Sequence, residues 1–147
     1  MSLKARLMDD LKTSMKSKNK LRKDTITMVR AAIKQKEVDE KVELEDEDVI
    51  QIISKQVKQK KDSIEGFEKG NREDLVDRTQ KEIDILMEYM PAQLSEEEID
   101  EIVKAVIDEL GANTMKDMGK VMSAVMPKVK GKADGGLVNK IVKQHLS

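Results

Sequence analysis

The chain has 147 residues, of which 39% are charged and 1% aromatic, and its net charge at pH 7 is -1. This length allows one domain or two small ones, and the composition favours charge-rich helices over a sheet core. Cysteine is absent, which excludes disulfides and thiolate metal sites. Neither a signal peptide nor a membrane-spanning apolar run is recognisable, so we expect a cytoplasmic protein.

Hydrophobic periodicity predicts an all-α, multihelical fold that begins with two helices. Ser2 is positioned to cap the first helix, which extends to a turn at about residues 17–19. The second helix is predicted over residues 21–38, where the small pair Ala31-Ala32 would let a neighbouring helix approach closely. The N-terminal part of the chain therefore starts with a helical hairpin.

Two longer helices are predicted next, over about residues 46–69 and 72–90. Acidic residues at the start of the first of these favour a helix N-terminus because of the helix dipole. Gly70 should end that helix, Asn71 can cap the following one, and Pro91 ends it. The short connection predicts a second antiparallel hairpin.

Residues 91–94 are the predicted joint between an N-terminal helical subdomain, residues 1–91, and a small three-helix subdomain, residues 92–147. Ser95 and Glu98 have the spacing of a capping box at the start of the fifth helix, which Gly111 should end. A core of this size is marginal when isolated.

Methionine spacing predicts a sixth helix, capped by Thr114 and ended or kinked by Pro127. Its methionines recur every three or four residues and so share one face. That face is either core, which is the commoner case, or an adaptable contact surface, because methionine repacks easily against different partners. The methionines are Met115, Met118, Met122 and Met126.

A lysine-rich loop, Lys128, Lys130 and Lys132 around Gly131, follows this helix. Asp134 can cap a seventh helix beyond it. Three lysines on a loop are by default solvated, but they can also attract an anion. The apolar face of the seventh helix is expected to comprise Val138, Ile141, Val142 and His145.

The small net charge hides four segments of opposite sign. Residues 1–36 are strongly basic and residues 37–48 strongly acidic, while residues 95–110 are acidic and residues 116–147 basic. The basic and acidic helices could simply attract one another or face solvent. Alternatively, the basic segments bind a polyanion.

Catalytic and metal-binding patterns are poorly represented. His145 is the only histidine, and a packed or surface role is far commoner for such a residue than a catalytic one. Gly119-Lys120 does not form a phosphate loop, because Thr114 occupies the position of the first glycine. The acidic run at residues 45–48 lacks the ligand spacing of a calcium loop. We expect no metal, no cofactor and no catalytic residue.

Several motifs near the C-terminus resemble the YqeY family of bacterial proteins. They are DMGKVM at residues 117–122, VMPK at 125–128, KGKADG at 130–135 and LVNK at 137–140. YMPAQLS at residues 89–95 also fits the joint of that family, and the similarity spans essentially the whole chain.

The part from about residue 115 to 146 is also similar to the tail domain of GatB, the B subunit of the glutamine-dependent aspartyl/glutamyl-tRNA amidotransferase. This resemblance implies a helical fold in two subdomains and a tie to tRNA and to carbon-nitrogen ligase activity with glutamine as amido-N-donor. The catalytic body of GatB has no counterpart here, so the resemblance does not supply that activity.

Three functions remain open from the sequence. The first is a tRNA-binding or tRNA-amidotransferase-associated module, in which lysines grip phosphates and Gly131 lets the backbone approach. The second is a protein-interaction adaptor that uses helical surfaces, and the third, which the residue inventory disfavours, is an independent enzyme. The predicted RNA contacts are Lys128, Lys130, Gly131 and Lys132, with Lys120, Lys140 and Lys143 on the flanking helices and a second basic zone at residues 12–36.

Overall fold

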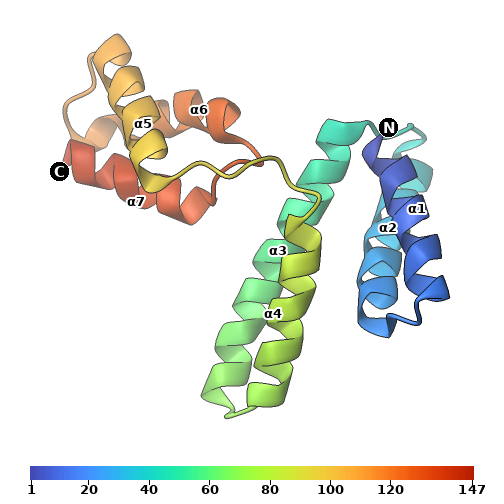
Figure 1. Ribbon diagram of the computed structural model, residues 1–147. Helices are drawn as coiled ribbons and strands as arrows, with labels where there is room; N and C mark the ends of the chain where they lie inside the picture. The colour runs from blue at the N-terminus through green and yellow to red at the C-terminus, as the bar shows by residue number, and fades with distance from the viewer. The chain divides into compact units, whose positions relative to one another are not determined.

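The computed structural model describes all 147 residues and contains seven α-helices, one short 3-10 helix and no strand. The all-α prediction is confirmed. The chain forms two compact units, Met1–Met90 and Pro91–Ser147. The elements are α1 (Leu3–Lys16), α2 (Lys20–Glu40), α3 (Asp46–Lys69), α4 (Glu73–Met87), α5 (Glu96–Leu110), η1 (Met115–Asp117), α6 (Met118–Val129) and α7 (Gly135–Leu146) (Figure 1). None of the helices is both long enough and apolar enough to span a membrane.

The N-terminal unit consists of two helix hairpins, α1–α2 and α3–α4. Ser2 caps α1 as expected, because its hydroxyl accepts a hydrogen bond from the Ala5 amide at 3.1 Å. α2 contacts both helices of the second hairpin, and α1 contacts α3. One apolar core joins all four helices. Its buried residues are Leu7, Ile26, Val29, Ile33, Leu44, Val49, Ile53, Val57, Ile83, Leu86 and Tyr89.

The ends of α4 differ from the prediction. Asn71 does not cap this helix, because it adopts a left-handed conformation with φ of 57°, and Arg72 takes the cap position without a side-chain hydrogen bond. The helix ends at Met87 rather than Met90. Beyond Met87 the amides bond to carbonyls three residues back, so the chain tightens into a turn before Pro91.

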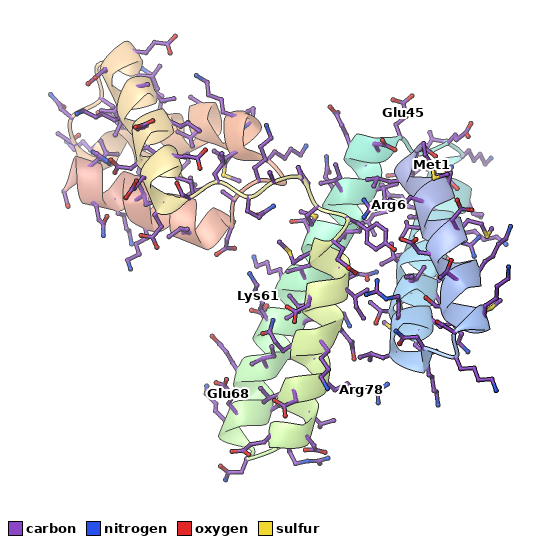
Figure 2. The ribbon with its side chains drawn as sticks, in the orientation of Figure 1. Met1, Arg6, Glu45, Lys61, Glu68 and Arg78 are labelled. Carbon is purple, nitrogen blue, oxygen red and sulfur yellow. The ribbon has the colours of Figure 1, made fainter.

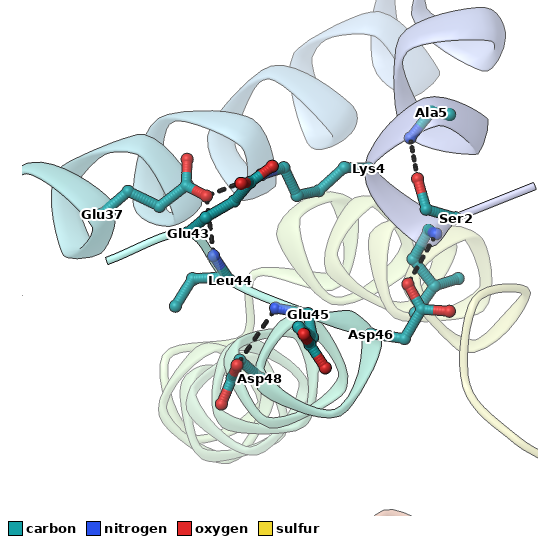
Figure 3. Close-up of polar contacts among 10 residues, drawn as sticks. Ser2, Lys4, Ala5, Glu37, Glu43, Leu44, Glu45, Asp46 and Asp48 are labelled. Carbon is teal, nitrogen blue, oxygen red and sulfur yellow. Dashed lines mark hydrogen bonds and ion pairs between the residues drawn. The ribbon is translucent and has the colours of Figure 1, made fainter. Parts of the chain in front are cut away.

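The basic and acidic segments of the N-terminal unit meet where α1 approaches the end of α2. Lys4 Nζ lies 2.6 Å from a carboxylate oxygen of Glu37 and 3.8 Å from one of Glu43. The same carboxylate of Glu37 accepts a hydrogen bond from the Leu44 amide at 2.8 Å (Figure 3). The hydrogen bond from Lys4, and then that from Leu44, lower the pKa of Glu37. At this junction the opposite charges attract one another within the fold.

A polar pair links α3 to α4. Lys60 Nζ lies 2.5 Å from a carboxylate oxygen of Glu82, and the two side chains are only 15% and 17% exposed. By contrast, Lys61 and Glu68 of α3 and Arg78 of α4 are exposed (Figure 2). The outer surfaces of this hairpin are therefore charged.

The C-terminal unit packs α5, α6 and α7 against one another in pairs. Ser95 and Glu98 form the predicted capping box, and Gly111, with φ of 66°, ends α5 as predicted. The core contains only aliphatic side chains. Its buried members are Ile99, Val103, Val106, Val121, Val125, Val129, Val138, Ile141, Val142 and Leu146.

Replacing Ser95 with alanine should destabilise the protein by about 1 kcal/mol, because the amide of Glu98 loses the acceptor that caps the helix. Chemical denaturation monitored by circular dichroism measures this change. Ser123→Ala is the matched control, since Ser123 is exposed within α6 and should change stability by less than about 0.5 kcal/mol. Equal effects of the two substitutions would show that the cap contributes nothing.

The methionine face of α6 is only partly core. Valines at positions 121, 125 and 129 are fully buried, whereas Met118, Met122 and Met126 only flank the core and Met115 is 43% exposed. The predicted cap is also wrong, because Thr114 precedes η1 and makes no side-chain hydrogen bond. Within α6 the three valines recur at the same four-residue spacing as Met118, Met122 and Met126, and it is the valine side of the helix that is fully buried.

Two further expectations for this unit change. Pro127 does not end α6, which continues to Val129, and the alternative, a kink at Pro127, stays a prediction. Ser123, whose carbonyl loses its helical donor to the proline, is exposed to water. In α7 the fourth buried residue is Leu146, whereas His145 is exposed and lies 2.5 Å from a carboxylate oxygen of Asp100. The histidine therefore lies on the surface of α7 rather than on its buried face.

Candidate functional site

The lysine bend, defined as residues 128–132, connects α6 to α7 by a tight turn. Lys128 lies in the last turn of α6 rather than on the loop, and Lys130 is the C-cap residue. The carbonyl oxygen of Val129 accepts hydrogen bonds from the amides of Lys132 at 2.8 Å and Ala133 at 3.1 Å. Gly131 has φ of 75°, a conformation that favours glycine, so the sequence Lys-Gly-Lys suits this turn.

The backbone of the bend is held by the segment that precedes α5. The Leu94 amide donates to the Lys132 carbonyl at 2.8 Å, and the Gln93 side-chain amide donates to the Gly131 carbonyl at 3.0 Å. Gln93 also bonds the Pro91 carbonyl at 2.8 Å, which fixes its own orientation. These contacts use carbonyl groups, so they order the bend while leaving the ammonium groups of the lysines free.

Sequence reasoning missed Gln93 and Leu94 as parts of the site. Their only sequence signal is the YMPAQLS motif at residues 89–95, which indicates a joint between subdomains. Such long-range hydrogen bonds to backbone carbonyls have no periodicity, so hydrophobic patterns cannot reveal them.

All six predicted lysine contacts are exposed, and none of them lies within ion-pair distance of a carboxylate. α5 carries seven acidic residues and packs against both α6 and α7, but its only ion-pair partner is His145, through Asp100. In this unit, therefore, none of the six lysines is directly paired with a carboxylate of the neighbouring acidic helix. The six lysines are Lys120, Lys128, Lys130, Lys132, Lys140 and Lys143.

The structure brings Lys128, Lys130 and Lys132 together on the bend. Lys120 lies two turns earlier on α6. Lys140 and Lys143 are one turn apart on α7, so they share a face of that helix. The basic zone at residues 12–36 belongs to the other unit.

The C-terminal unit contains no Phe, Tyr or Trp side chain on which an unpaired base could stack. The two aromatic residues of the chain, Phe67 and Tyr89, both lie in the N-terminal unit. Base stacking is therefore not available at the lysine bend. The structure also contains no group of three or more His, Asp or Glu side chains arranged to hold a metal ion. What the bend offers chemically is a set of ammonium donors on an ordered backbone.

Replacing Gly131 with alanine should cost roughly 1–2 kcal/mol, because a side chain is strained at this positive φ. Gly119→Ala is the matched control. Gly119 lies in α6, and a Cβ added there would point into open space, so alanine at this position should stabilise the protein by up to about 1 kcal/mol through the unfolded state. Thermal unfolding of both variants measures the contrast, and a stabilising Gly131→Ala would contradict the described turn.

Comparison with known proteins identifies the family. The family described as "Yqey-like protein" matches residues 4–146. "Altered inheritance of mitochondria protein 41, mitochondrial" from Pyrenophora tritici-repentis is 37% identical over 143 residues, which covers 95% of this chain and 78% of that protein. The proteins of the same name from Lachancea thermotolerans and Kluyveromyces lactis are 44% and 43% identical.

The alignments with these last two proteins each cover 72% of this chain. They cover 58% of the Lachancea protein and 59% of the Kluyveromyces protein. This chain therefore aligns with less than two thirds of the length of those two relatives. The match to the family, by contrast, extends over nearly every residue, including both helical units and the lysine bend. The resemblance inferred from the sequence motifs is confirmed: the chain belongs to the YqeY family.

Proposed function

We propose that this protein is a tRNA-binding module whose lysine bend contacts phosphates of the folded RNA. The observation that carries the proposal is the state of Lys128, Lys130 and Lys132. They are exposed and unpaired, and they stand on a turn ordered by Gln93 and Leu94. An ordered backbone reduces the entropy that must be lost when the phosphates bind.

The form of the surface favours folded RNA over single strands. Lysine contacts phosphate as a point charge and reads backbone shape rather than base identity. Because the C-terminal unit has no Phe, Tyr or Trp and its one imidazole, His145, is paired with Asp100, it is poorly supplied for stacking on unpaired bases, which is the usual mode for single-stranded RNA. Lys120, Lys140 and Lys143 would extend the contact onto α6 and α7.

Association with a tRNA amidotransferase is the narrower part of the proposal. It rests on the similarity of residues 115–146 to the GatB tail, and the protein would hold tRNA while other subunits perform the chemistry. The names of the relatives refer to inheritance of mitochondria and do not mention RNA. Purification of the tagged protein from cells tests this association. If amidotransferase subunits are recovered with it and are lost after ribonuclease treatment, the association is mediated by RNA. A partner that is retained after ribonuclease treatment favours the adaptor alternative.

The compartment is also part of the proposal. We expect this chain in the cytoplasm, whereas the names of the relatives place those proteins in mitochondria. Fractionation of the cells that make the protein tests this expectation. Recovery outside the cytosolic fraction would contradict it.

The experiment that tests the proposed function compares two RNAs of equal length with the purified full-length chain. Folded tRNA should bind more tightly than an unstructured uridine homopolymer, because only the folded RNA presents a fixed phosphate surface. Filter binding at several salt concentrations measures both affinities. If neither RNA binds, or if the homopolymer binds more tightly, the proposal fails.

A further inference from the structure

A groove in the N-terminal unit is separate from the lysine bend and has a different chemistry. It lies between α1 and α2, which pack side by side (Figure 1), and has a volume of about 720 Å³. Its lining includes the apolar side chains of Ala5, Met8 and Ala31 and the cationic side chains of Arg30 and Lys34. The groove therefore combines an apolar floor with a cationic rim.

The floor of the groove has the shape required for helix packing. Ala31 lies at the middle of α2 and is exposed, together with Thr27 one turn before it and Lys34 one turn after it. Small side chains at such a position let a second helix approach to the short interaxial distances seen in packed helices. Met8 on the opposite wall is 37% exposed, and its flexible side chain can adjust to a partner.

The rim of the groove has an excess of positive charge. Arg30 and Lys34 make no ion pair. Glu37 is the only carboxylate in the lining, and it is already bound by Lys4 and by the Leu44 amide. The groove therefore complements an apolar surface that has acidic residues along its edge.

We propose that the α1–α2 groove binds an amphipathic helix of a partner protein, with the apolar face of that helix over Ala31 and its acidic edge against Arg30 and Lys34. An RNA ligand fits the groove less well. Phosphates gain nothing from Ala5, Met8 and Ala31, and no aromatic side chain lines the groove for base stacking. The helix-in-groove mode uses both the apolar floor and the charged rim.

Selection from a display library of random 16-residue peptides, with the purified full-length chain as bait, tests this proposal. Peptides that also bind an Ala31→Glu variant are removed, because the larger charged side chain fills the groove. The selected peptides should place apolar residues at helical spacing with Asp or Glu on one edge. Lys58→Glu/Lys61→Glu on the exposed part of α3 is the matched control for charge.

The selected peptides should bind Arg30→Glu/Lys34→Glu at least about tenfold more weakly than the unaltered chain, because like charges are then opposed. The α3 control should retain the original affinity, and circular dichroism checks that all variants keep their helices. Failure to enrich any peptide specific for the intact groove, or unchanged affinity for Arg30→Glu/Lys34→Glu, overturns the proposal. If no peptide is enriched but tRNA binds the unaltered chain more tightly than Arg30→Glu/Lys34→Glu, the groove binds RNA, which likewise overturns the proposal.

Discussion

Simultaneous replacement of Lys128, Lys130 and Lys132 with glutamate should weaken tRNA binding by on the order of a hundredfold at about 0.1 M salt, because three phosphate contacts and their released counterions are lost. Helical content should not change, since the three side chains are exposed and make no ion pair. Fluorescence anisotropy with labelled tRNA measures the affinity, and circular dichroism measures the helix.

The salt dependence separates phosphate contacts from other causes of weaker binding. Each lost contact should reduce the slope of log affinity against log salt concentration by about 0.7–0.9. The matched control replaces Lys55, Lys58 and Lys61 of α3 with glutamate, which changes the net charge equally at three other exposed residues. If the α3 control loses as much affinity as the variant of the bend, net charge rather than the bend drives binding.

Val125→Asp should have the largest effect on stability, with a loss of more than about 4 kcal/mol, because it places an unpaired charge in a small core. Val125 has no exposed surface and lies among residues of α5, α6 and α7. We expect the C-terminal unit to unfold while the N-terminal unit, which has its own core, keeps its structure. Hydrogen exchange measured by mass spectrometry locates the loss of protection.

Met115→Asp provides the comparison for that experiment. Met115 is 43% exposed, so a charge there remains in water and should change stability by less than about 0.5 kcal/mol. The pair of variants therefore tests which face of this segment is core. Equal destabilisation by both would restore the methionine face as the core, contrary to the structure.

The parts of the fold that local chemistry determines could be predicted from the sequence. Ser95 with Glu98 and Gly111 set the limits of α5 through caps that involve only neighbouring residues. The prediction for Asn71 is wrong because asparagine suits both a helix cap and a left-handed turn. The methionine face is only partly core for another reason: in α6 the valines and the methionines recur at the same spacing, so periodicity alone does not tell which set is buried more deeply.

The candidate site could be predicted less completely. The lysines of the bend could be predicted as candidates because they cluster in the sequence, and their exposure follows from the turn around Gly131. The support from Gln93 and Leu94 spans nearly forty residues of sequence and could not be inferred from local patterns. The α1–α2 groove is also a tertiary feature, although the Ala31-Ala32 pair indicates close helix approach at that point.

The most direct measurement is ultraviolet crosslinking of the protein in living cells, followed by sequencing of the attached RNA and by mass spectrometry of the crosslinked peptides. Our account predicts that tRNA is enriched and that the crosslinks fall within residues 120–143, around the lysine bend. Absence of enriched tRNA, or crosslinks confined to residues 1–90, would contradict it.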